Sequence, residues 1–154
     1  MFNRFFPQYI DNTYHGRKLA VWLFAVFVFI KVAMSLNSIF NGYMVASTAD
    51  GIPLDTFTPA SAQAVVSMYA AWGLAHLTIC LLCILVLARY RALIPFMFAL
   101  LLLEHIGRRL IFIVMPIVRT GTSSGLYVNL VLIALLVVGL ALSLWIRNTR
   151  RAME

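Results

Sequence analysis

Four long apolar runs, separated by shorter polar connections, dominate the pattern of this chain. They cover residues 19–40, 64–88, 92–118 and 126–146. Each run can cross the roughly 30 Å of a bilayer's hydrocarbon core, because a helix rises about 1.5 Å per residue. Barrel strands would alternate apolar and polar residues, whereas these runs are continuous. The pattern therefore predicts an all-α membrane protein built as a four-transmembrane-helix bundle.

The segments around these runs complete the predicted organisation. Residues 1–18 combine several aromatic side chains with few charges, which is typical of a segment at the membrane interface. Residues 41–63 form the longest connection, and residues 147–154 form a basic tail. We expect a single transmembrane domain over residues 19–146, because the four runs leave no room for a second one.

Composition supports a membrane protein and narrows the partners. Hydrophobic residues make up 63% of the chain and charged residues 11%, which excludes a soluble domain and a disordered chain. The formal net charge is +7. Nucleic-acid binding would need these charges gathered on one exposed surface, but they are distributed by membrane side instead. We therefore expect membrane lipids, and no nucleic acid, as partners.

The distribution of basic residues predicts the orientation in the membrane. Eight of them flank the runs on one side: Arg4, Arg17, Lys18, Arg89, Arg91, Arg147, Arg150 and Arg151. On the other side the connections carry one basic residue, Arg119. By the positive-inside rule both termini are cytoplasmic, in a multi-pass protein of the inner (plasma) membrane.

The connection over residues 41–63 is then external, and it is long enough to hold structure of its own. Asp50, Gly51 and Pro53 are turn formers. Thr58 followed by Pro59 is typical of a helix start, with a capping hydroxyl and a proline at the first helical position. We therefore expect the second helix to begin outside the membrane.

Ionisable residues on three runs are expected at one depth. Glu104 lies about 18 Å along the third run from its cytoplasmic end. Lys31 is twelve residues past Leu19, and His76 is twelve residues past Ala64, so each comes near the middle of its own run. Charged groups in hydrocarbon cost a few kcal/mol each. These side chains should therefore face one another inside the bundle.

Helical spacing gives each of these runs one polar stripe. On the third run Glu104 and Arg108 are four residues apart and share a face, beside a second stripe of His105 and Arg109. Two further stripes follow the same helical periodicity: Lys31, Ser35 and Ser38 on the first run, and Tyr69, Trp72, His76, Cys80 and Cys83 on the second. The fourth run has Gly139 and Ser143 as a small-residue packing seam.

The balance of charge leaves two interpretations open. Three basic residues, Lys31, Arg108 and Arg109, share the single carboxylate of Glu104, which leaves an excess of positive charge. Deprotonation of Lys31 would reduce this excess, and so would arginine side chains that extend toward the outer face of the membrane. The first interpretation is a buried hydrogen-bonded network that fixes the helix register, with Glu104 as the shared counter-charge. The second is an electropositive, outward-opening cavity that takes an anionic lipid headgroup or a small anion.

Redox chemistry is a further alternative. His76 and His105 on neighbouring antiparallel helices could ligate a haem b iron from both sides, and a quinone is the related possibility. Cys80 and Cys83 lack a second cysteine pair with which to exchange a disulfide, so we expect them to act as small packing groups. The chain has no HExxH motif, and we assign no metal ligands and no catalytic residues.

From these features we predict three functions, in order of preference. The first is an accessory or interaction subunit with a buried polar network of Lys31, His76, Glu104, His105, Arg108 and Arg109, working with a protein partner or as a homo-oligomer. The second is binding or transport of an anionic lipid headgroup or small anion by the same residues. The third is a haem or quinone redox carrier. Nothing in the chain indicates an enzyme.

Overall fold

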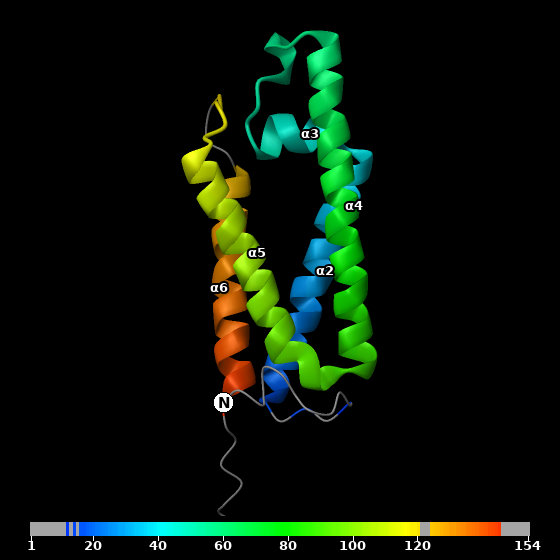
Figure 1. Ribbon diagram of the computed structural model, residues 1–154, viewed down its shortest axis with the longest axis vertical. Coiled ribbons are helices and arrows are strands. Elements are labelled where there is room, and N and C mark those ends of the chain that lie inside the picture. Colours follow the sequence, from blue (N-terminus) through cyan, green and yellow to red (C-terminus); the bar gives the residue numbers. More distant parts are fainter. Residues whose placement is uncertain (1–11, 13, 15, 121–123, 146–154) are drawn as a thin grey trace, which may run out of the picture.

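The computed structural model describes residues 12, 14, 16–120 and 124–145. Within them every regular element is a helix, as Figure 1 shows, which confirms the all-α prediction for this part of the chain. Three helices are long and apolar enough to cross a membrane: Lys18–Phe40, Pro59–Arg89 and Ser124–Leu144. The predictions for most of residues 1–18 and for residues 147–154 lie outside the described residues.

The first two long helices begin close to their predicted positions. Helix α2, Lys18–Phe40, is 23 residues long. Helix α4, Pro59–Arg89, is 31 residues long and starts at the predicted capping pair. The side-chain oxygen of Thr58 accepts a hydrogen bond from the Ser61 backbone N–H at 3.3 Å, which satisfies one donor of the first turn. Helix α4 therefore begins before the apolar run of residues 64–88.

The third long helix ends earlier than the sequence predicts. Helix α5 is Ile94–Val114, preceded by the short 3-10 helix η3, Arg91–Leu93. The predicted span of residues 92–118 is wrong at its carboxyl end. Pro116 disfavours the helical conformation for the residue before it, and Met115 accordingly has φ −123° and ψ 77°.

Helix α5 differs from the other long helices in its polarity. It carries Glu104, Arg108 and Arg109 within 21 residues, and it is not among the three helices apolar enough to count as membrane spans. Helix α6, Ser124–Leu144, begins slightly before the predicted run of residues 126–146.

Residues 41–58, called the cap below, fold across one end of the long helices (Figure 1). The cap contains the single turn α3 (Gly42–Met44), the π-helical turn η1 (Val45–Ala49) and the 3-10 turn η2 (Leu54–Thr56). Gly51 has φ 71°, a left-handed conformation that side chains disfavour. A small apolar cluster anchors the cap to α4: Ala46, Ile52, Leu54 and Tyr69.

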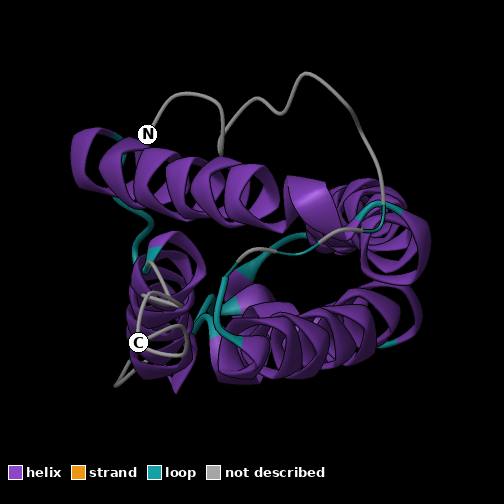
Figure 2. Cartoon of the chain, turned by 90° about the horizontal axis from the view of Figure 1, so that it is seen from below, coloured by secondary structure: helices purple, strands orange, loops and turns teal. Residues whose placement is uncertain are grey.

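Helix α2 is the central packing element of the molecule. It packs along α4 and also against α6, while α5 packs mainly on α6. Figure 2, seen from below, shows that the described chain consists of helices joined by loops. Helices α2 and α4 approach closely at Gly73, where a Cβ would lie 2.8 Å from the Ser35 carbonyl oxygen. Glycine at this position therefore lets the two backbones meet.

The main apolar core fills the half of the molecule away from the cap. In it the rings of Phe24 and Phe98 meet edge to face, with centroids 5.1 Å apart. The predicted small-residue seam on α6 is buried, and Gly139 leaves the space that the Phe98 ring occupies. The polar residues of the long helices lie between this core and the cap.

Candidate functional site

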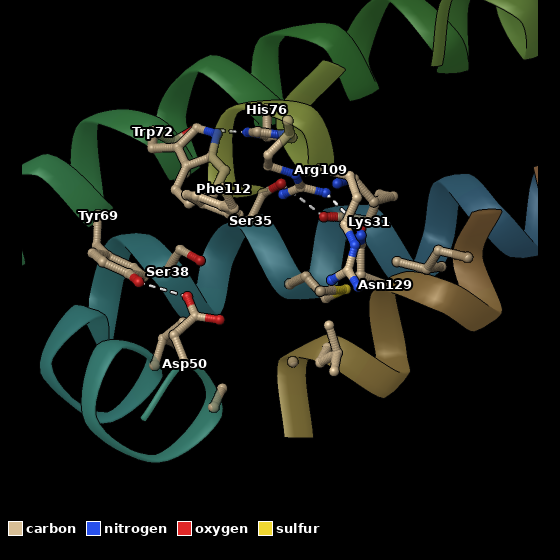
Figure 3. A pocket seen from close by; sticks show the side chains of 18 of the residues that line it. Lys31, Ser35, Ser38, Asp50, Tyr69, Trp72, His76, Arg109, Phe112 and Asn129 are labelled. Carbon is tan, nitrogen blue, oxygen red and sulfur yellow. Dashed lines mark hydrogen bonds between the residues drawn. The ribbon is translucent and has the colours of Figure 1, made fainter. Parts of the chain in front are cut away.

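A partly open cavity of about 130 Å³ lies between the long helices and the cap (Figure 3). The lining side chains that carry charge or hydrogen-bonding groups are Lys31, Ser35, Ser38, Asp50, Tyr69, Trp72, His76, Arg108, Arg109, Arg119 and Asn129. Apolar side chains complete the wall: Met34, Val45, Phe112, Leu126 and Leu132. A cavity of about this size can hold one benzene molecule, so it suits a small ligand or a single headgroup.

Lys31 provides the most buried charge of the cavity. Only 5% of the residue is exposed, and it lies in the middle of α2. The hydroxyl of Ser35, one turn further along, donates to the Lys31 carbonyl oxygen at 2.7 Å and is thereby occupied. Among the described residues, none forms a hydrogen bond or an ion pair with the Lys31 ammonium.

Arg108 is the best-partnered cation of the lining. Its guanidinium donates to the Asn129 side-chain oxygen at 3.0 Å, which ties α5 to α6. It also lies over the Trp72 ring at 5.2 Å from the centroid, and its Nε is 3.7 Å from a Glu104 oxygen. Arg109 lines the same cavity without a hydrogen bond or ion pair to another described residue.

Glu104 stands beside the cavity at the interface of α4 and α5. Its Oε1 lies 3.2 Å from His76 Nε2, and its Oε2 lies 2.6 Å from His105 Nδ1. His76 faces the cavity, whereas His105 is completely buried against Phe27, with ring centroids 5.8 Å apart. The carboxylate therefore joins a histidine of the cavity wall to a histidine of the core.

The cap and the connection between α5 and α6 close the other end of the cavity. The Tyr69 hydroxyl donates to Asp50 Oδ2 at 2.5 Å, so α4 holds the cap. The backbone N–H of Thr120 donates to the Gly51 carbonyl oxygen at 2.9 Å, so the α5–α6 connection holds it too. Arg119 lies over the Phe112 ring at 5.9 Å from the centroid and also lines the cavity.

The structure brings the six residues singled out from the sequence into one region. Four of them line the cavity, namely Lys31, His76, Arg108 and Arg109, and the other two, Glu104 and His105, adjoin it. Sequence reasoning missed further members of the lining: Asp50, Phe112, Arg119 and Asn129. Asp50 and Arg119 did carry a signal, because few charged residues occur in the predicted external connections.

The structure also defines the surroundings of the cysteines and histidines that were considered for redox chemistry. Cys80 and Cys83 are buried free thiols on α4. Both nitrogens of His76 lie within hydrogen-bond distance of acceptors, and His105 Nδ1 lies close to the same carboxylate. Haem ligation by His76 and His105 would require them to leave Glu104, and it stays a prediction.

Positive charge exceeds negative charge in this region. Four cations line the cavity, Lys31, Arg108, Arg109 and Arg119, while Asp50 and the adjoining Glu104 are the carboxylates among the described residues there. Two cations are therefore in excess, and Lys31, Arg109 and Arg119 have no hydrogen bond or ion pair to another described residue. No protein-family model, curated protein or solved structure matches this chain.

Proposed function

We propose that this chain is a four-helix integral protein of the inner (plasma) membrane with both termini in the cytoplasm. Helix α5, with 21 residues, spans about 31 Å and is long enough to be the fourth crossing. Its charged residues point to the bundle interior, where polar groups are tolerated in a membrane. Arg17, Arg89 and Arg91 lie at the ends of helices opposite the cap, which supports a cytoplasmic assignment for that side.

Within this bundle the cavity binds a tetrahedral oxyanion, a phosphate or sulfate group. The observation that carries this function is Lys31, a residue that is 5% exposed and lines the cavity, and whose ammonium has no hydrogen bond or ion pair to another described residue. A buried charge without a partner is strongly unfavourable, and proteins tolerate one where a ligand neutralises it. Ligand binding therefore accounts for a lysine that the fold alone leaves unpaired.

Arg109 is the second recognition group. Its planar guanidinium can donate two parallel hydrogen bonds to an oxyanion, whereas an ammonium acts as a compact point charge. The pair matches a phosphate group, which carries about −1.5 to −2 charges at neutral pH. The apolar lining and the volume of about 130 Å³ favour one small anion, or one headgroup whose acyl chains stay outside.

The test is thermal unfolding of the purified protein in dodecyl maltoside micelles. Four additions are compared: sulfate, inorganic phosphate, phosphatidylglycerol and phosphatidylcholine. Stabilisation by the free oxyanions identifies a small-anion site, and stabilisation by phosphatidylglycerol alone identifies a headgroup site. A protein that responds equally to phosphatidylglycerol and phosphatidylcholine, and to neither free anion, contradicts the proposal.

Three variants separate specific binding from general charge. Lys31→Met and Arg109→Gln should abolish the anion-dependent shift, because each removes a cation that the ligand needs. Arg89→Gln is the matched control, since Arg89 is exposed at the far end of α4 from the cap. Equal loss in the control would mean that the anions act on overall charge, and the site would be rejected.

The role of an accessory or interaction subunit, with a protein partner or as a homo-oligomer, stays a prediction. It is compatible with anion binding, because a lipid headgroup held in the cavity would leave the outer helix faces available.

A further inference from the structure

Both ring nitrogens of His76 face hydrogen-bond acceptors. Nδ1 lies 3.0 Å from the Trp72 backbone oxygen, and Nε2 lies 3.2 Å from Glu104 Oε1. A carbonyl oxygen can only accept, so a hydrogen bond to it requires a proton on Nδ1. A neutral imidazole has a single N–H, and its Nε2 would then point a lone pair at the carboxylate. A neutral His76 beside an ionised Glu104 would therefore leave one of these two contacts without a proton to donate.

One added proton resolves the conflict in either of two ways. Protonated His76 can donate from Nε2 to an ionised Glu104, or protonated Glu104 can donate to a neutral His76. Both forms have the same number of protons and the same net charge of zero. The pair thus holds one proton more than a neutral histidine and a free carboxylate would.

His105 does not supply this proton. Its Nδ1 lies 2.9 Å from the Leu101 carbonyl oxygen and 2.6 Å from Glu104 Oε2, so the single Nδ1–H lies between two acceptors. Its Nε2 is buried without a hydrogen-bond partner among the described residues. Burying a charged ring there would be costly, so we take His105 as neutral, with its Nδ1–H directed at the Leu101 carbonyl oxygen.

The remaining charged and titratable groups around His76 come from every neighbouring element. They are Lys31 on α2, Tyr69, Cys80 and Cys83 on α4, Glu104, His105, Arg108 and Arg109 on α5, Asp50 in the cap, and Arg119 after α5. Helix α6 contributes the uncharged Asn129 to this lining. In this set Glu104 is the acceptor nearest to His76, and Arg108 lies beside the same carboxylate.

We propose that His76 and Glu104 form a proton-binding site in the cavity wall, and that oxyanion binding at Lys31 and Arg109 is linked to that proton. This inference rests on the proposed function. When the pair holds its proton it is neutral, and Lys31 and Arg109 are available to the ligand. When the proton leaves, a net negative charge appears beside the cavity and competes with the ligand for the same cations.

The linkage has a definite sign. An anion binds more tightly to the protonated form, so binding favours proton uptake, and by thermodynamic reciprocity a bound anion makes the pair hold its proton more strongly. For one linked proton, the dissociation constant rises by up to about tenfold per pH unit over the range in which the pair releases it. Affinity is constant at lower pH, where the pair stays protonated.

Isothermal titration of the purified protein with sulfate, from about pH 6 to about pH 9, tests the linkage around the range in which histidines titrate. Sulfate keeps its charge over this range, unlike phosphate. Phosphatidylglycerol, whose charge is also constant, replaces sulfate if the headgroup site is the one that responds. We expect weaker binding at high pH, and uptake of up to one proton when the titration is repeated in buffers of different ionisation enthalpy.

Glu104→Gln fixes the charge of the pair. The amide can donate to His76 Nε2, which keeps the hydrogen bond and the neutral charge without an ionisable carboxyl. This variant should lose the part of the pH dependence that the pair supplies, and any weakening of sulfate binding that persists at high pH belongs to deprotonation of Lys31. Asp55→Asn is the matched control, because Asp55 is an exposed carboxylate of the cap outside the cavity lining, and its pH dependence should equal that of the wild type.

Failure of the linkage differs from failure of the proposed function. Equal affinity at every pH, with no proton uptake, would reject the linkage and leave anion binding intact. Absence of binding at every pH would reject anion binding itself. If Glu104→Gln fails to fold, Lys31→Arg decides instead. Its guanidinium stays charged over the whole range, so proton uptake on sulfate binding then belongs to the pair, and its absence rejects the linkage.

Discussion

Replacing Lys31 with methionine should stabilise the ligand-free protein and abolish its response to anions. Lys31 is 5% exposed, and its ammonium has no hydrogen bond or ion pair to another described residue. In the ligand-free fold, the longer-range attraction of Glu104 offsets only part of the cost of desolvating this charge. An unpaired lysine at mid-membrane costs about 2.5 to 3.5 kcal/mol on insertion scales. The cavity allows partial hydration, so we expect a gain of about 2 kcal/mol in the free energy of unfolding.

The expected change is large enough to measure. For a chain of 154 residues, 1 kcal/mol shifts the melting temperature by about 2 to 4 °C, so Lys31→Met should melt about 4 to 8 °C higher after dialysis. Sulfate at a hundredfold excess over its Kd adds about 2.7 kcal/mol to the wild type and nothing to the variant. The order of the two melting temperatures should therefore reverse when sulfate is added.

Lys18→Met is the control for general effects of removing a lysine. Lys18 is exposed at the start of α2, and its loss should leave both the stability and the sulfate response unchanged. A Lys31→Met variant that melts below the wild type without ligand would refute the reasoning. That result would mean that the ammonium has a stabilising partner within the fold, as a structural network requires.

Three further predictions concern other parts of the molecule. Replacing Cys80 and Cys83 together with alanine should preserve folding and anion binding, since both are buried free thiols, and loss of binding in a folded variant would revive a redox role. Gly73→Ala should cost about 1 to 3 kcal/mol in chemical denaturation, because its Cβ would lie 2.8 Å from the Ser35 carbonyl oxygen, and an unchanged midpoint would contradict the close approach of α2 and α4. Reporters fused at residue 50 should be external and those at residue 90 cytoplasmic, and an external reading at residue 90 would overturn the orientation.

The sequence predicted the long helices well because their apolar runs are long and continuous. The start of α4 was also readable, since Thr58 and Pro59 form a strong local signal. The end of α5 was predicted too late, because hydropathy continues past Val114 while the backbone stops at Pro116. Local proline chemistry outweighs hydropathy at that boundary.

The site was predictable where depth and helical spacing define it. Lys31, His76 and Glu104 were expected near one depth, and they do come together beside one cavity. The separate surroundings of the two histidines were harder to predict. His105 lies on the buried face of α5 with Phe98 and Leu101. His76 lies on the same face of α4 as Tyr69 and Trp72, and all three line the cavity.

The cap could not be predicted from local patterns. Its hydrogen bond from Tyr69 to Asp50 and its bond from Thr120 to Gly51 join residues far apart in the sequence. Gly51 and the turn formers around it indicate a reversal of the chain but not the surface against which it packs. The cap's contribution of Asp50 to the cavity therefore follows only from the tertiary fold.

Native mass spectrometry of gently extracted protein tests the central claim most directly. The wild type is compared with the double variant Lys31→Met, Arg109→Gln, each with added sulfate and with added phosphatidylglycerol. We expect the wild type to retain one anion or one anionic lipid per chain and the double variant to retain neither. Identical retention by the two proteins would contradict oxyanion binding in this cavity.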